Sequence, residues 1–256
     1  MAGKEDYLSF LPSCHRGMVR STPAERRAME RPFTIVFILF PQLTQLDFTG
    51  PFEVLQRLPG ARLVVASREG GSLSADSGLT FTGLARLSDV TEADAICVPG
   101  GYGLTAALGD RELVAHVQRL GRAARYVTSV CTGSLLLAAA GLLEGKRATC
   151  HWAFRPLLAE LGIQTEAARV VRDGNVITGG GVTAGIDFAL TLVAEIAGAD
   201  VARSIQLSIE YDPQPPFGAG SPETAPAEVL TRVRDRALLQ YPERRAALLA
   251  ALARPV

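Results

Sequence analysis

A single cysteine stands where a predicted buried strand turns abruptly into a predicted helix. Residues 126–130 have the composition of a strand, Cys131 follows, and the small residues Thr132, Gly133 and Ser134 lead into an apolar helix over 135–140. This has the form of a nucleophile elbow with Cys in place of Ser. Because a helix N-terminus stabilises a thiolate, we expect a lowered pKa and a nucleophilic Cys131. The alternative is a cysteine that only packs under a turn.

Two further sites follow other predicted strands. Gly100 and Gly101 come directly after the strand at 94–99, and the N–H groups of Gly101 and Thr132 would form an oxyanion and substrate pocket if they converge. The two glycines could equally form only a turn. Asp47 stands in an apolar stretch after the first strand, where burial would raise its pKa and let it donate a proton. Its alternative role is a helix N-cap.

Three histidines narrow the choice of a catalytic base. His15 lies in the N-terminal stretch and His116 on an amphipathic helix, so we expect both to be solvated. His151 follows the strand predicted at 147–150 and is the one candidate to face Cys131. The alternative for His151 is a packed histidine stacked near Trp152.

A competing motif lies at residues 179–184, which read Gly-Gly-Gly-Val-Thr-Ala and match G-x-G-x-x-A. A dinucleotide site would also need an acidic residue at the end of a following strand, and no such strand is predicted. The sequence contains no P-loop, no His-Glu-x-x-His and no cluster of metal ligands. We therefore expect no metal and no organic cofactor.

The candidate residues must be positioned by a regular fold. From residue 33 onward the chain alternates strand and helix patterns about five times, which favours a mostly parallel sheet between two helix layers. Strands are predicted at 33–40, 61–67, 94–99, 126–130, 147–150 and 175–178, a hairpin within 70–83, and helices at 185–196 and 199–209. Thr49, Gly50 and Pro51 suit the start of the first helix, with proline in its first turn. Active sites of such sheets lie at the carboxyl ends of the strands, where all our candidates fall.

The composition of the chain limits the kinds of molecule that we expect it to bind. The 256 residues carry 26 basic and 26 acidic side chains, which argues against binding of nucleic acid and suits a small uncharged organic substrate. The apolar runs are far shorter than the roughly 20 residues that span a bilayer, so we expect no membrane insertion. Cysteines at positions 14, 97, 131 and 150 form no Cys-x-x-Cys pair, which favours a reduced, cytoplasmic protein.

The sequence pattern divides the chain into three segments. We expect a disordered, arginine-containing extension over 1–31 and one catalytic domain over 32–212. Residues 213–256 are expected to form a proline-rich stretch and two closing helices, at 227–239 and 243–252, packed on the same domain.

Several of these segments, in this order over about residues 33–210, resemble the ThiJ/PfpI group of the class I glutamine-amidotransferase-like superfamily. They are Leu46-Asp47-Phe48-Thr49-Gly50-Pro51, Val98-Pro99-Gly100-Gly101, Ser129-Val130-Cys131-Thr132-Gly133-Ser134 and Thr149-Cys150-His151-Trp152. The resemblance implies a flavodoxin-like three-layer sandwich, a homodimer, and Cys131 as nucleophile with Asp47 and Thr132 as essential partners. Within the group the chain most resembles bacterial isonitrile hydratases, which implies a lyase that hydrates an isonitrile to an N-substituted formamide through a Cys131 thioimidate.

Departures from the family pattern argue against peptidase and amidotransferase activity. Thr132 stands where peptidase-like members carry a histidine, and no histidine follows His151 to complete an amidotransferase triad. Two alternatives stay open. One is a stand-alone ligand-sensing domain like that of AraC-type regulators, although the 46 residues after Glu210 are fewer than their two helix-turn-helix units need. The other is a glyoxalase- or deglycase-type enzyme acting on α-oxoaldehydes.

Overall fold

A computed structural model of the protein describes residues 31–253. The expected extension therefore lies almost wholly outside the described residues, as do Cys14 and His15. Within the described part, eight strands form one sheet in the order β3-β4-β2-β1-β5-β6-β10-β9. Its inner strands are parallel and are β2 (Ala61–Ser67), β1 (Phe33–Leu39), β5 (Ala95–Val98), β6 (Tyr126–Val130) and β10 (Val176–Gly179). β4 (Thr80–Arg86) also runs parallel to β2, whereas the edge strands β3 (Gly71–Ser74) and β9 (Val170–Asp173) are antiparallel.

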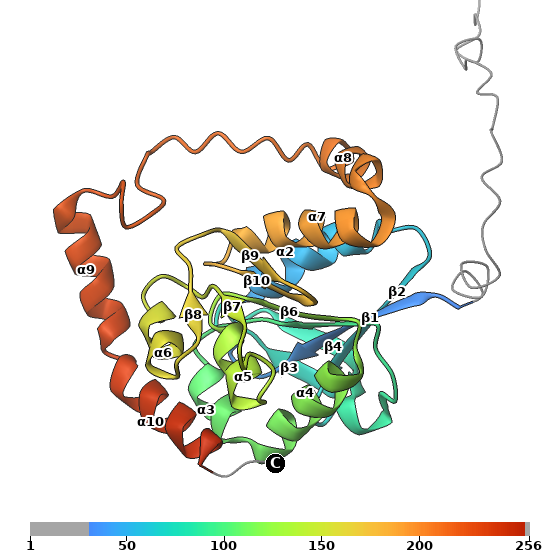
Figure 1. Ribbon diagram of the computed structural model, residues 1–256, viewed down its shortest axis with the longest axis horizontal. Helices are drawn as coiled ribbons and strands as arrows, with labels where there is room; N and C mark the ends of the chain where they lie inside the picture. The colour runs from blue at the N-terminus through green and yellow to red at the C-terminus, as the bar shows by residue number, and fades with distance from the viewer. Residues whose placement is uncertain (1–30, 254–256) are drawn as a thin grey trace, which may run out of the picture. The chain divides into compact units, whose positions relative to one another are not determined.

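Helices cover both faces of this sheet (Figure 1). One layer contains α2 (Gln45–Leu55), α7 (Ala184–Ala197) and α8 (Ala199–Ser208). The other contains α3 (Leu104–Gly109), α4 (Arg111–Ala123) and α5 (Gly133–Ala139). Every residue of β5 and β6 is buried, as expected for strands covered on both sides. The predicted flavodoxin-like three-layer sandwich is confirmed.

The first helix begins earlier than predicted. α2 starts at Gln45, so Pro51 lies inside the helix and not in its first turn. Proline there removes one backbone hydrogen bond, but its ring is buried and packs against Gly185 of α7, where a Cβ would come within 3.0 Å of the ring. Close packing of α2 on α7 thus accommodates the proline, and the earlier start places Asp47 in the first turn of α2.

Two parts of the chain differ from the predicted pattern. The apolar spacing of Leu113, Val117 and Leu120 predicts one helix after Gly103. The segment forms two helices, because Asp110 caps α4 by accepting a hydrogen bond of 3.1 Å from the Leu113 N–H. The strand predicted at 147–150 is only β7 (Arg147–Ala148), which pairs with β8 (Gln164–Thr165) in a separate small sheet. Between them lies α6 (Arg155–Glu160), which the sequence pattern had not indicated.

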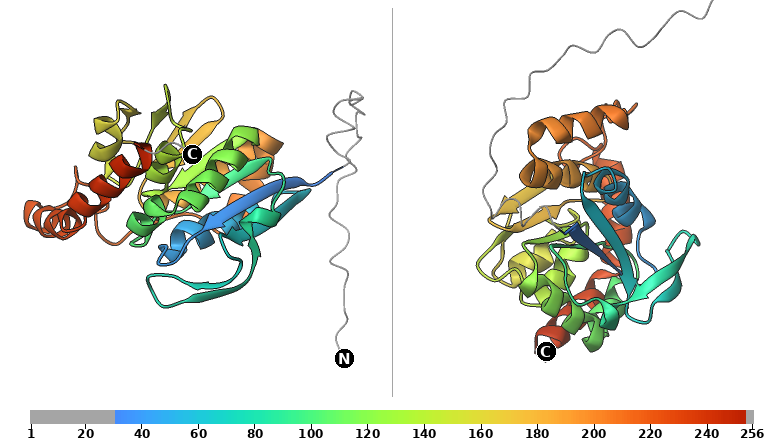
Figure 2. Two further views of the ribbon diagram at one scale, coloured as in Figure 1. Left: turned by 90° about the horizontal axis from the view of Figure 1, so that it is seen from below. Right: turned by 90° about the vertical axis from the view of Figure 1, so that its right-hand side faces the viewer.

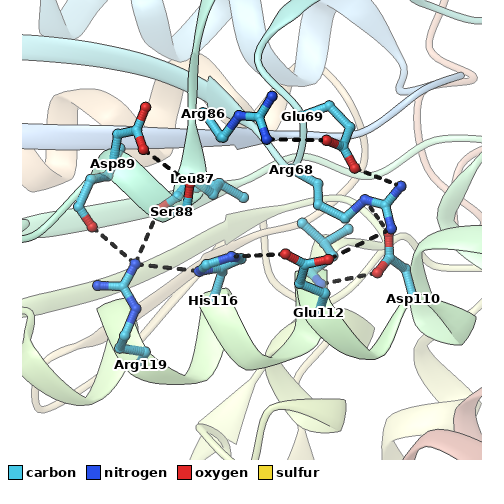
Figure 3. Close-up of polar contacts among 12 residues, drawn as sticks. Arg68, Glu69, Arg86, Leu87, Ser88, Asp89, Asp110, Glu112, His116 and Arg119 are labelled. Atoms are coloured by element: carbon cyan, nitrogen blue, oxygen red, sulfur yellow. Dashed lines mark hydrogen bonds and ion pairs between the residues drawn. The ribbon is translucent and has the colours of Figure 1, made fainter.

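A surface network joins α4 to the 3-10 turn η1 (Leu87–Asp89) and to the end of β2 (Figure 3). Arg119 donates to the carbonyl oxygens of Leu87 and Val90, at 3.1 and 2.9 Å. Arg68 lies 3.3 Å from a carboxylate oxygen of Asp110 at the start of α4. A single exposed ion pair contributes little to stability. The two hydrogen bonds from Arg119 are therefore the contacts that hold η1 and the following Val90 against α4.

The C-terminal helices are α9 (Ala227–Leu238) and α10 (Tyr241–Leu252), and a long connection brings the chain to them from α8 (Figures 1 and 2). α10 packs against α3 and α5, with Leu248 buried. At its start, the Tyr241 hydroxyl donates to Glu160 of α6 at 2.8 Å, and the Tyr241 ring stacks on Phe154. None of the helices within residues 31–253 is long and apolar enough to cross a membrane.

Gly133, at the start of α5, offers a stability test of the elbow. A Cβ there would overlap the carbonyl oxygen of Val98 and lie 2.7 Å from that of Pro99, both backbone atoms that cannot rotate away. We expect Gly133→Ala to destabilise the fold by about 3 kcal/mol, whereas Gly109→Ala, with nothing within 4 Å, should change stability by less than about 1 kcal/mol. Urea denaturation followed by circular dichroism measures both, and equal effects would contradict this packing.

Candidate active site

Cys131 forms a strained elbow between β6 and α5. Its φ is 58°, a left-handed conformation that costs a non-glycine residue about 1–2 kcal/mol. The strain is stabilised locally, because the Cys131 N–H donates to two carbonyl oxygens, those of Gly179 at 3.1 Å and Gly180 at 2.8 Å. Since β10 pairs with β6, its end lies beside the elbow and supplies these acceptors.

The loop after β5 approaches the elbow very closely. A Cβ on Gly100 would lie 2.5 Å from both the backbone nitrogen and the hydroxyl of Thr132, so only glycine fits. The Gly101 N–H donates to the Thr132 hydroxyl at 3.2 Å. The structure therefore brings Gly101 and Thr132 together as predicted, but this N–H bonds within the protein and is not directed at a substrate.

Asp47 reaches the same point from α2. Its side chain is fully buried, accepts a hydrogen bond of 2.9 Å from the Gly100 N–H at Oδ2, and interacts with the Cys131 thiol. Its Oδ1 has no nitrogen or oxygen partner within the described residues. Burial raises the pKa of Asp47 from 3.8 to about 7, which confirms the predicted direction. The N-cap alternative is wrong, because Thr44 occupies that position.

The thiol of Cys131 does not have the lowered pKa that we predicted. Burial raises its pKa well above the ordinary value of 9.0, and the nearby Asp47 carboxyl and Cys150 thiol raise it further. The backbone N–H groups of Thr132 and Val182 hydrogen-bond the sulfur and act in the opposite direction. The favourable helix N-terminus is thus present, but desolvation outweighs it, so the Cys131 thiol holds its proton more tightly than a free cysteine does.

The glycine run at 179–184 serves this elbow and is no dinucleotide loop. Two of its carbonyls accept from Cys131, and the N–H of Val182 reaches the Cys131 sulfur. The N–H groups beside the sulfur are therefore those of Thr132 and Val182. Sequence reasoning missed Val182, and the available signal was a run of small residues directly after a strand.

His151 lies at the site, but as a packed neutral ring. It stacks on Trp152, with ring centroids 5.6 Å apart, and its Nδ1 accepts a hydrogen bond from the Ala153 N–H at 3.3 Å. Burial, and then the positive charge of Arg244, lower the pKa of His151 to about 4. Nε2 therefore carries the proton near neutral pH, so the ring can offer a donor there. His116 lies on α4 between Glu112 and Arg119 and does not line the Cys131 cavity, but its side chain is only 14% exposed, so the expectation that it is solvated is wrong.

A cavity of about 480 Å³ opens at Cys131. Its walls include the predicted site residues Gly101, Thr132 and His151. Other walls come from residues that sequence reasoning had not considered, on α9, on α10 and at the junction between them: Arg232, Val233, Arg236, Ala237, Gln240 and Arg244. Nothing in the sequence of two amphipathic helices indicated that they would cover a site formed about 100 residues earlier. Across residues 31–253, no group of three or more His, Cys, Asp or Glu side chains is placed to hold a metal ion.

Comparison with known proteins agrees with this geometry. Residues 33–195, which contain the sheet, Asp47 and the elbow, match the DJ-1/PfpI family. The chain belongs to the DJ-1/PfpI family. A solved DJ-1/PfpI relative, a THiJ/PfpI family protein from Pseudomonas syringae, superposes with a TM-score of 0.82 at 38% identity, over 90% of this chain and 98% of that one.

Two curated relatives of this chain are named for different functions. The isonitrile hydratase of Pseudomonas putida is 50% identical over 203 residues, which are 79% of this chain and 89% of that protein. The HTH-type transcriptional regulator CdhR of Pseudomonas aeruginosa is 32% identical over 184 residues, but these are only 53% of its length.

Asp47→Asn tests the buried carboxyl through stability. A raised pKa means that folding favours protonated Asp47, so this contribution is complete below about pH 4 and is lost as the pH rises through about 7. Relative to Asp47→Asn, the wild type should lose stability between pH 4 and 8, on the order of 4 kcal/mol if the whole shift acts on folding. Chemical denaturation at several pH values measures this, and parallel profiles would contradict a buried, titrating Asp47.

Thiol alkylation tests the raised pKa of Cys131. Among Cys97, Cys131 and Cys150, we expect Cys131 to react first with iodoacetamide, since it alone lines the cavity. Its rate should still rise roughly tenfold per pH unit between pH 7 and 9, because the thiolate fraction grows by that factor below the pKa. Peptide mass spectrometry identifies the labelled residue. A rate that levels off near pH 7 would restore the lowered pKa that we had predicted.

Proposed function

We propose that this protein is an isonitrile hydratase, a lyase that adds water to an isonitrile and releases an N-substituted formamide. The observation that carries the proposal is the pairing of Cys131, which lines a cavity, with a protonatable Asp47 buried beside it. The 50% identity to the Pseudomonas putida enzyme over most of both chains supports it.

The first step uses the protons that burial keeps on the pair. Addition of the Cys131 thiol to an isonitrile R–N≡C forms an S–C bond and a C–H bond, giving the thioimidate R–N=CH–S–Cys131. The C–H bond needs one proton: protonated Asp47 donates it to the carbon as sulfur attacks, and the thiol proton then passes to Asp47 in its place.

The second step releases the product. Water attacks the thioimidate carbon, one of its protons goes to nitrogen, and the C–S bond breaks to give R–NH–CHO and the thiol, whose proton returns through Asp47. The Thr132 hydroxyl accepts from Gly101, which leaves its own hydrogen available to orient the water. The Thr132 and Val182 N–H groups stabilise negative charge on sulfur as it leaves. His151 lines the cavity as a neutral donor. A homodimer and a cytoplasmic location stay predictions.

An activity assay tests the proposal. Purified protein should convert cyclohexyl isocyanide and related alkyl isonitriles to formamides, detected by chromatography with mass spectrometry. Cys131→Ala should lower kcat/KM at least about 10³-fold and Asp47→Asn by roughly 10²–10⁴-fold, because the first removes the nucleophile and the second the proton carrier.

Cys97→Ala is the matched control. Cys97 is equally buried on the neighbouring strand β5 but does not line the cavity, so this variant should keep wild-type turnover. No formamide from a broad panel of isonitriles would refute the proposal. Turnover of methylglyoxal instead would favour the α-oxoaldehyde alternative, and ligand binding without any turnover would favour the sensor domain.

A further inference from the structure

Arg244 is a buried charge without a carboxylate partner in the described part of the chain. It lies on α10, is only 2% exposed, and lines the cavity that contains Cys131. Its Nη2 donates to the Gly101 carbonyl at 3.1 Å and to the Gln240 side chain at 2.9 Å, and its guanidinium carbon lies 4.2 Å from the centre of the Phe154 ring. Its Nε is buried and has no partner within residues 31–253. A charge buried in this way is costly unless something pairs with it.

Two more arginines face the same cavity. Arg232 and Arg236 lie on α9, are exposed, and form no ion pair with any residue that the structure describes. Glu228 and Asp235 lie beside Arg232 around a neighbouring hollow that Arg232 also lines, but neither forms an ion pair with it or lines the Cys131 cavity. None of the described residues that line the Cys131 cavity is acidic. Although the whole chain has no net charge, this cavity is strongly cationic.

We propose that the substrate of this enzyme carries a carboxylate, bound by Arg244 with Arg232 and Arg236, so that the preferred substrates are isocyano carboxylates. This rests on the proposed hydratase function. The guanidinium of Arg244 has unused N–H groups that match a carboxylate, and a ligand there would supply its missing counter-ion. The cavity has the size of a small-ligand site and provides apolar walls, Phe154, Val182 and Val233, for the carbon chain between the two ends.

This assignment revises the expectation of an uncharged substrate, which rested on the net charge of the whole chain. It also assigns catalysis and substrate recognition to different parts of the molecule. The family domain over 33–195 supplies Asp47, Cys131 and Thr132, whereas α9 and α10, outside that range, supply the arginines. Substrate preference would then change with the C-terminal helices while the reaction stays the same.

A matched substrate series tests the proposal. We would measure kcat/KM for ω-isocyano carboxylates with two to six carbons and for their methyl esters, which differ only in charge and one methyl group. The wild type should prefer the best carboxylate over its ester by roughly tenfold or more, as expected for a charge-assisted hydrogen bond. This ratio should fall toward one in Arg244→Gln and in the double variant Arg232→Ser/Arg236→Ser, and Arg244→Lys should restore part of it.

The controls separate recognition from folding. Arg232 and Arg236 are exposed, so their replacement is not expected to affect stability, and Arg234→Ser, on the same helix but outside the cavity lining, should keep the wild-type ratio. Equal kcat/KM for acid and ester in the wild type would overturn the carboxylate proposal and leave the hydratase function standing. A ratio that persists in both arginine variants would also overturn it.

A binding assay makes failure of the two proposals distinguishable. The chain contains one tryptophan, Trp152, which stacks on the cavity residue His151, so its fluorescence should report occupancy. The probes are ω-cyano carboxylates and their methyl esters. If the acids bind roughly tenfold tighter than the esters and Arg244→Gln removes this preference, the anion site stands even where no isonitrile is hydrated. If acids and esters bind equally, the carboxylate proposal fails whatever the turnover.

Discussion

The backbone of Cys131 is held in a left-handed turn by two carbonyl oxygens from the end of β10, and the geometry of the whole site depends on that contact. The turn directs the thiol out of the sheet at the start of α5. It also requires the loop after β5 to pass so close that Gly100 and Gly133 have no room for a Cβ. A local strain of about 1–2 kcal/mol is thus stabilised by non-local parallel strand pairing, which explains why the elbow requires the complete sheet.

Burial decides the chemistry at this turn. A helix N-terminus alone would favour a thiolate, yet Cys131 is enclosed and its neighbour is a carboxyl group, so both groups hold their protons more tightly than in water. For most cysteine enzymes this would be unfavourable. For addition of a thiol to an isonitrile carbon, the proton held on Asp47 is useful, because one proton must end on carbon. The same burial keeps His151 neutral near pH 7. Among the described residues of the site, the buried side chain that carries a permanent charge is therefore Arg244.

The C-terminal helices give the site its walls. α10 is held in place by its buried Leu248 and by the hydrogen bond from Tyr241 to Glu160 of α6. This anchoring places Arg244 over the ring of Phe154 and against the Gly101 carbonyl. Gly101 therefore connects the elbow, through the Thr132 hydroxyl, to the distal helix. A change in the packing of α10 would be transmitted to the loop that contacts the nucleophile.

The sequence by itself determined the alternating strands and helices, the elbow at Cys131 and the buried Asp47, because each is encoded by a local pattern of apolar, small and turn-forming residues. Only the tertiary structure decided the sign of the shift in the Cys131 pKa, the role of the Val182 N–H and the position of Arg244. Each of these depends on which distant segments enclose the site. Desolvation and electrostatic contacts are properties of the packed surroundings, so no periodicity within α10 could reveal that one of its arginines would lie in the cavity at Cys131.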